Sequence, residues 1–206
     1  IYNQNPLTTG LQDNIVVNAS KLDTTYNGIE LAVQRRFSAN AYLRAGYHYG
    51  KDLGRIAAGE LNDPNADIFA DGAVGTDEPH QLKVSGALLL PARISVSAFF
   101  QARSGQPKVR QLQVGRALVP TLTRATQTVR LERNDENRYD SVALLDLRVG
   151  RPFRFGSWRT EIFADAYNLL NANTVLTEVT TVGPNLGQVS QTIPPRVVRV
   201  GAKLAF

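Results

Sequence analysis

The charged side chains that could do chemistry stand at alternate positions of extended segments. Five of them matter most, namely Arg44, Arg148, Glu161, Asp165 and Arg199. Successive side chains of a β-strand point to opposite faces, so charges two positions apart share a face. Carboxylates facing arginines on a neighbouring strand pair with them, and they could also form a polar wall for a substrate. We expect Glu161 and Asp165 to form structural ion pairs with Arg148 and Arg159.

Catalytic and metal-binding chemistry has little support in this sequence. The chain has no cysteine and only two histidines, which excludes a thiol nucleophile and cysteine-ligated metals. Nothing places either His48 or His80 beside a nucleophile, so we predict no enzyme activity, no catalytic residue, no metal and no cofactor. One segment offers oxygen ligands that calcium prefers, and a solvated acidic loop is the expected explanation for it. Its residues are Asp63, Asn65, Asp67, Asp71 and Asp77.

The overall charge does not indicate a nucleic-acid binder. The 206 residues include 23 basic and 18 acidic side chains, for a net charge of +5. Of the 23 basic residues 18 are arginines, and they are spread at strand-like spacing without forming a basic run. A nucleic-acid site needs clustered basic charge, so we predict no nucleic-acid partner. The longest apolar run, residues 86–90, is far too short for a membrane helix, whereas membrane strands need only about 9–11 residues.

Alternation of apolar and polar residues is the dominant pattern. In residues 27–37, for example, Ile29, Leu31 and Val33 alternate with Glu30 and Gln34. A period of two is the mark of a strand with two different faces. It recurs in seven segments, so we predict an all-β, antiparallel up-and-down fold. The predicted strands are about 27–37, 41–49, 80–90, 94–102, 143–153, 158–168 and 197–206.

Short and long connections alternate strictly between these segments. The short ones are 38–40, 91–93 and 154–157, and the long ones are 51–79, 104–140 and 170–195; residues 1–20 are predicted to be part of another extracellular loop. Compact soluble domains rarely contain such long loops. Transmembrane barrels of the outer membrane combine short periplasmic turns with long extracellular loops. The connections therefore favour a transmembrane β-barrel.

A barrel strand must present apolar residues to lipid, while its lumen tolerates charge. We predict that Arg44, Arg148, Glu161, Asp165 and Arg199 face the lumen. Arg35 is the main charge on the opposite face, and it lies close enough to a short turn for its stem to reach the headgroups. The residues predicted to face lipid are Ile29, Leu31, Val33, Leu82, Val84, Leu88, Ile94, Val96, Val200 and Leu204.

The last segment carries a further signal. Its apolar residues are Val198, Val200, Ala202, Leu204 and Phe206, at every second position up to a terminal aromatic side chain. This arrangement resembles the assembly signal of bacterial outer-membrane proteins. The resemblance implies that the barrel-assembly machinery is a partner.

Several segments together, in order, resemble the C-terminal barrel part of TonB-dependent receptors, specifically the Oar-like branch with a carboxypeptidase-regulatory-like N-terminal domain. These segments are 26–37, 47–51, 78–86, 104–107, 145–149, 163–171 and 196–206. The resemblance implies a 22-stranded barrel with a plugged lumen. Residues 1–206 would then be a C-terminal fragment of the barrel domain, located in the bacterial cell outer membrane.

The resemblance also implies partners and a function. The partners would be outer-membrane lipid and lipopolysaccharide, and the function would be import of a small-molecule or peptide ligand that the sequence does not identify. The plug and the TonB box have no matching segment, so TonB would be reached through other parts of the protein.

Seven strands taken from a larger barrel leave two unpaired edges, at 27–37 and 197–206. We therefore expect an open, curved antiparallel sheet and not a sealed pore. One alternative is a small standalone porin or adhesin barrel, which is disfavoured because bacterial single-chain barrels have even strand numbers. The other is a soluble carbohydrate-binding β-sandwich, because a sheet with one wet face shows the same alternation.

Overall fold

The computed structural model describes the chain except residues 12, 14, 16–19, 56–62, 157 and 206. Among the described residues the only helical elements are three short 3₁₀ helices, η1 (Pro6–Thr8), η2 (Ser20–Leu22) and η3 (Pro91–Arg93). No helix in this part of the chain is long and apolar enough to cross a membrane. The predicted all-β class is confirmed.

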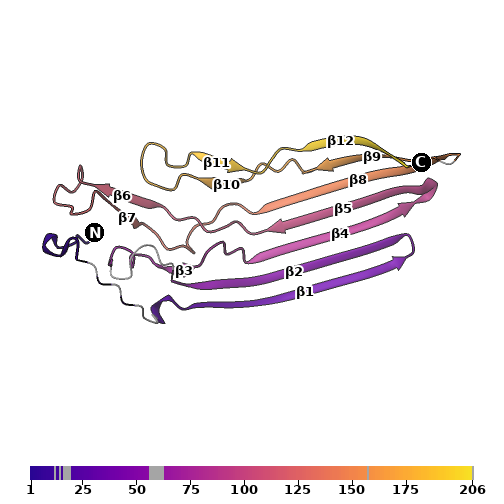
Figure 1. Ribbon diagram of the computed structural model, residues 1–206. Helices are drawn as coiled ribbons and strands as arrows, with labels where there is room; N and C mark the ends of the chain where they lie inside the picture. Colours follow the sequence, from indigo (N-terminus) through magenta and orange to yellow (C-terminus); the bar gives the residue numbers. More distant parts are fainter. Residues whose placement is uncertain (12, 14, 16–19, 56–62, 157, 206) are drawn as a thin grey trace.

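Seven long strands form one antiparallel sheet in which each strand pairs with the next along this series (Figure 1). The short β3 (Asp71–Ala73) pairs with one end of β2, and two small hairpins, β6–β7 and β10–β11, form separate sheets. The hairpin strands are β6 (Gln111–Gly115), β7 (Thr126–Arg130), β10 (Val175–Glu178) and β11 (Val189–Thr192). The long strands, in sheet order, are β1 (Thr24–Ser38), β2 (Ala41–Arg55), β4 (His80–Leu90), β5 (Ile94–Arg103), β8 (Val142–Phe155), β9 (Trp158–Tyr167) and β12 (Val197–Ala205).

The two ends of the sheet differ as the connections predict. Residues 39–40, residues 91–93 and Gly156 lie between strands at one end, here called the turn end, on the right of Figure 1. Residues 63–79, 104–141 and 168–196 lie at the other end, the loop end, together with the first residues of the chain. At the turn end η3 reverses the chain because Ala92 and Arg93 both adopt a φ of 61°, which few non-glycine residues do.

The predicted and observed strand boundaries agree best where the alternation of apolar and polar residues is strongest. β4 covers the predicted residues 80–90, whereas β1 and β2 extend to Thr24 and Arg55 at the loop end. Lys51 and Asp52 are both polar, so no alternation marks this part of β2. The backbone pairing nevertheless continues to Thr24 and Gly54, because main-chain hydrogen bonds do not depend on side-chain polarity.

The register separates two faces across the whole sheet. One row runs from Val33 through Ala45, Val84 and Phe100 to Leu145. We call this side the apolar face, and it holds all ten residues predicted to face lipid. The opposite side is the polar face, whose charged residues are Glu30, Arg36, Arg44, Asp52, Lys83, Arg103, Asp146, Arg148, Arg154, Arg159, Glu161, Asp165, Arg199 and Lys203.

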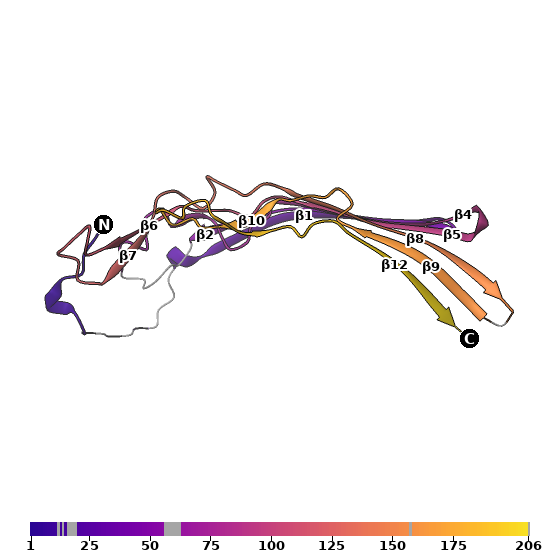
Figure 2. The same cartoon turned by 90° about the horizontal axis from the view of Figure 1, so that it is seen from above.

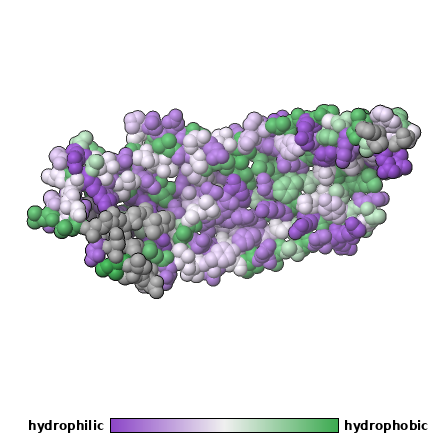
Figure 3. Space-filling view, in the orientation of Figure 1, coloured by the Kyte–Doolittle hydropathy of each residue, from purple (hydrophilic) through white to green (hydrophobic). Residues whose placement is uncertain are grey.

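The long sheet is a single curved layer (Figure 2). Ile29 and Val200 on the apolar face are 64% and 74% exposed, and hydrophobic residues are visible at the surface toward the turn end (Figure 3). Among the described residues, the buried hydrophobic ones all lie at the loop end. They are Ala70, Ala73, Val109, Val114, Leu122, Val129, Val142 and Ile193. The core therefore belongs to the loops, and neither face of the long sheet carries one.

The expected open sheet is confirmed, because β1 and β12 stand at opposite ends of the strand order. Closure into a transmembrane barrel by further strands stays a prediction.

Candidate functional site

Three charged residues form a row on the polar face of β8, β9 and β12. The register sets Arg148 opposite Asp165, and Asp165 opposite Arg199. Arg199 donates to Oδ2 of Asp165 from Nε at 3.0 Å and from Nη2 at 2.5 Å. Nη1 of Arg148 lies 3.4 Å from Oδ1 of the same carboxylate. Asp165 is only 3% exposed, so it is a nearly buried anion between two cations.

Aromatic side chains complete this cluster. The guanidinium carbon of Arg148 lies 3.9 Å from the ring centroid of Phe163, where the ring's negative face attracts a cation. Nη2 of Arg148 is 3.8 Å from Oε1 of Glu161, and Nη2 of Arg199 donates to the Tyr167 hydroxyl at 3.1 Å. The charges thus compensate one another across three strands, which is the structural ion pairing expected for Asp165.

The register corrects one partner in that expectation. Arg159, which was predicted to pair with a carboxylate, lies opposite Arg154 near the turn end. Arg199 is the arginine that lies beside Asp165 instead. Sequence reasoning missed this because the offset between β9 and β12 is set by a long connection. Arg44 lies on the same face but three strands away from Arg148, and it has no ion-pair partner among the described residues. The orientation of this face toward a lumen stays a prediction.

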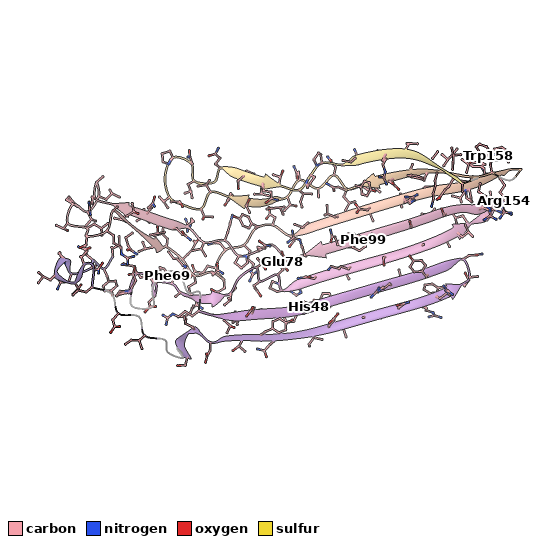
Figure 4. All side chains as sticks on the ribbon, viewed as in Figure 1. His48, Phe69, Glu78, Phe99, Arg154 and Trp158 are labelled. Carbon is pink, nitrogen blue, oxygen red and sulfur yellow. The ribbon has the colours of Figure 1, made fainter. Side chains whose placement is uncertain are left out.

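Aromatic residues lie at both ends of the apolar face. At the turn end the Phe153 and Phe155 centroids are 6.5 Å apart, and the exposed Trp158 stands opposite Phe155 (Figure 4). At the loop end the Tyr47 hydroxyl lies 2.7 Å from Nδ1 of His80, and Tyr49 lies 4.9 Å from His80 between ring centroids.

Three arginines occur on the apolar face; Arg55 lies at the loop end, and the two near the turn end, Arg35 and Arg151, sit beside aromatic rings. Arg35 lies 5.1 Å from the Phe37 centroid, and Arg151 lies 5.1 Å from the Phe153 centroid. Only Arg35 was singled out from the sequence. Each stem can run along an aromatic surface while its charged group stays in water.

The long connections are joined to one another at the loop end. Arg138 binds Asp77 through Nη2 at 2.5 Å and donates from Nη1 to the Asp77 carbonyl at 2.7 Å. Lys108 lies 3.1 Å from Oε1 of Glu178, and the backbone nitrogen of Gln111 donates to the Thr180 carbonyl at 3.0 Å. Segments 63–79 and 168–196 are therefore both linked to the segment 104–141 that lies between them in the chain.

Another ion pair of this layer joins the exposed Arg110 to the buried Glu132. Arg110 donates to Oε2 from Nη2 at 2.8 Å and from Nε at 3.0 Å, and its backbone nitrogen donates to Oε1 at 2.8 Å. Glu132 is 4% exposed. Hydrogen bonds from Arg110 hold the pKa of the Glu132 carboxyl below its ordinary value, although burial opposes this shift, and the same pairing raises the pKa of Arg110.

Two motifs from the sequence analysis prove to be corners at the loop end. A Cβ on Gly105 would overlap the Tyr139 carbonyl, so only glycine permits this close approach. Asn168 ends β9 with a φ of 49°, which asparagine tolerates better than most residues. Its side-chain amide donates to the carbonyls of Ala172 and Pro194 at 2.9 and 2.8 Å. These two residues therefore fix the positions of the chain segments that they join.

The acidic residues considered for calcium are committed to other bonds. Asp77 pairs with Arg138, and Asp67 and Asp71 lie 3.6 and 3.9 Å from Arg55. Asp63 accepts hydrogen bonds from Asn65 and Gln127. Across the described part of the chain, no group of three or more His, Cys, Asp or Glu side chains is arranged to hold a metal ion.

A cavity of about 350 Å³ opens at the loop end. It lies between the first residues of the chain, residues 63–65 and residues 122–127, and its walls combine polar and apolar surface. Asp63 and Asn65 were considered as calcium ligands, with a solvated acidic loop expected instead, and no cavity was predicted because the segments that line it are far apart in the chain. The long sequence separation leaves no local signal for such a site.

Comparison with known proteins adds no relative. No model of a known protein family matches the chain, and no curated protein matches it. The resemblance to TonB-dependent receptors therefore rests on the sequence motifs alone.

Proposed function

We propose that this chain forms part of the barrel wall of a TonB-dependent outer-membrane receptor that imports a ligand. The observation that carries the proposal is the uncovered single-layer sheet. Across seven strands it keeps an apolar face apart from a charged face.

An apolar face of this size needs a cover. Soluble domains bury such a face against a second layer, and large exposed apolar patches mark interaction or membrane surfaces. Leu31 and Val33 are 61% and 62% exposed, and the described residues place no second sheet over them. Hydrocarbon chains of a bilayer would cover this face completely, whereas a β-sandwich would need a facing sheet.

The spacing of the aromatic residues supports the same proposal. From Tyr49 at the loop end to Ala41 at the turn end, β2 advances eight residues, or about 27 Å along the strand. A strand tilt of about 40° reduces this to roughly 20 Å along the membrane normal, close to the apolar band of about 25 Å in outer-membrane barrels. The aromatic groups would then lie at the two lipid–water boundaries.

The open edges fit a wall segment better than a complete barrel. β1 and β12 each have one partner strand in the described part of the chain, so each leaves a row of backbone groups that lipid cannot satisfy. Further strands would pair with both edges in a larger barrel. The polar face would line the lumen, and the joined loops would face the outside of the cell and meet the ligand first.

Fluorophore quenching tests the facing of the sheet. Since the chain has no cysteine, single cysteines at Val84 and Leu204, and at their neighbours Lys83 and Lys203, can each be labelled with bimane in the membrane-inserted protein. We expect quenchers on lipid acyl chains to act on positions 84 and 204, and aqueous iodide to act on positions 83 and 203. Equal quenching of both pairs would overturn the membrane proposal. Co-purification of the whole receptor with TonB tests the transport part.

A further inference from the structure

The first residues of the chain are bound by two loop segments, 63–65 and 121–123, whose contact surface beside the cavity is here called the groove. Oδ1 of Asn65 accepts from the Tyr2 backbone nitrogen, and Nδ2 of Asn65 donates to the Tyr2 carbonyl, both at 2.8 Å. One amide side chain thereby binds both polar backbone groups of Tyr2. The hydroxyl of Thr123 donates to the Gln4 carbonyl at 2.6 Å.

The side chain of Asn3 makes the second set of contacts. Its Nδ2 donates to the Thr121 carbonyl at 2.8 Å, and its Oδ1 accepts from the Thr123 backbone nitrogen at 2.8 Å. Ile1 and Tyr2 keep 55% and 59% of their surface exposed. The groove, formed by Asp63, Asn65, Thr121 and Thr123, therefore contacts the backbone of the segment and one amide side chain.

The walls of the groove are also bonded to one another through contacts that do not involve residues 2–4. Asn65 is 4% exposed, and Oδ1 of Asp63 accepts from its backbone nitrogen and from its Nδ2, both at 2.9 Å. The other oxygen of Asp63 accepts from Gln127 at 3.2 Å and lies 3.5 Å from Arg124. A binding group that is already ordered loses little entropy when a ligand binds.

We propose that this groove is a receptor site for extended peptides, occupied in this structure by the chain's own segment Tyr2–Gln4. Main-chain hydrogen bonds give affinity in such recognition, and a few side-chain contacts give specificity. The favoured peptide has an Asn after the residue whose backbone Asn65 binds. The adjacent cavity of about 350 Å³ has room for further peptide side chains. As a ligand site for the proposed receptor, the groove rests on the proposed function.

The tethered segment competes with any free peptide, because attachment to the same chain gives it a high effective concentration. Weak binding is therefore expected in the unmodified protein. A Tyr2→Pro, Asn3→Ala double variant lacks the backbone N–H and the amide of the tethered segment but leaves the groove intact. This opened variant should bind a free peptide at least about tenfold more tightly than the unmodified protein.

The probe is a fluorescein-labelled peptide with the sequence of residues 1–8, and its anisotropy is measured with the membrane-inserted protein. In the opened variant, Asn65→Ala should weaken binding about tenfold or more. Thr123→Val, which keeps the side-chain shape, should weaken it less. Asn185→Ala, in a loop away from the groove, should have no effect. A probe methylated on its Tyr2 nitrogen should bind about fivefold to tenfold more weakly, with the protein unchanged.

The proposal is overturned if the opened variant binds no better than the unmodified protein, or if the methylated probe binds as well as the plain one. The quenching pattern at positions 83, 84, 203 and 204 is measured on the same samples. If peptide binding is lost while the quenching pattern is intact, only the peptide-site proposal is refuted. If peptide binds but the quenching pattern is absent, the membrane proposal is refuted and the peptide-site proposal stands.

Discussion

Placing a charge at the middle of the apolar face tests the membrane proposal energetically. Val84 lies on β4, between β2 and β5, in the row that runs from Val33 to Leu145. We choose Val84→Arg because the pairing of β4 on both sides holds the backbone in place. The new side chain must then stay on the apolar face.

The expected cost follows from the depth of Val84. It lies four residues from His80 and six from Leu90 along β4, or about 14 Å and 20 Å from the two ends of that strand. An arginine at the lipid-facing midplane of a barrel costs about 2–4 kcal/mol, and one near the boundary costs about 0–1 kcal/mol. Val84→Arg should therefore lower the folding equilibrium about 30-fold or more. Leu90→Arg, at the turn end of the same face, should have a much smaller effect.

The folded fraction of each variant is measured in guanidinium titrations of the membrane-inserted protein, from its heat-modifiable mobility on gels. Lys83→Gln is the matched control, since it changes the neighbouring residue on the polar face. Leu204→Arg repeats the test on β12. If Val84→Arg and Leu204→Arg are as stable as Lys83→Gln, the assignment of the lipid face is wrong. Equal losses for Val84→Arg and Leu90→Arg would contradict the depth argument.

Three further predictions concern the ion pairs and the topology. Asp165→Asn should lower the guanidinium midpoint more than Glu161→Gln does, because Asp165 is nearly buried between two arginines while Glu161 lies 3.8 Å from Arg148; equal shifts would contradict this. The lowered pKa of Glu132 means that its ionised form stabilises the folded loops above the ordinary carboxyl pKa of about 4.3, and that this contribution is lost as the pH falls through the lower folded-state pKa. Limited proteolysis of the β6–β7 region should therefore increase between about pH 5 and pH 3, and Glu132→Gln should remove this part of the pH dependence; an unchanged dependence would refute the role of the pair. Protease added to intact cells should cut within 51–79 or 104–140, whereas cleavage at 38–40 or 154–157 would invert the proposed topology.

Side-chain alternation alone was enough to predict the long strands. It works for β4 and β5 because each face of this sheet meets one kind of environment, so the residue type at each position reports its face. The alternation of short and long connections likewise predicts which strands are joined tightly. Together these patterns placed Val84 and Leu204 on one face and Arg148 and Asp165 on the other.

The small strands at the loop end were missed. β6 has an alternating pattern, in which Leu112 and Val114 alternate with Gln111 and Gln113, but it spans only five residues. A pattern so short does not stand out within a long polar connection. β3 has three residues and depends on the extension of β2 for its pairing. Such strands form because a partner edge is available, which local sequence does not reveal.

The sequence by itself determined the two faces and the two ends of this protein, because strand alternation and connection length are local properties. Only the tertiary structure decided which distant groups meet. The register across β9 and β12 set Arg199, instead of Arg159, beside Asp165, and the folding of the loops brought Asn65 to Tyr2. These contacts join residues 34 and 63 positions apart. They depend on how long connections fold back, and that is set by the packing of the whole loop layer.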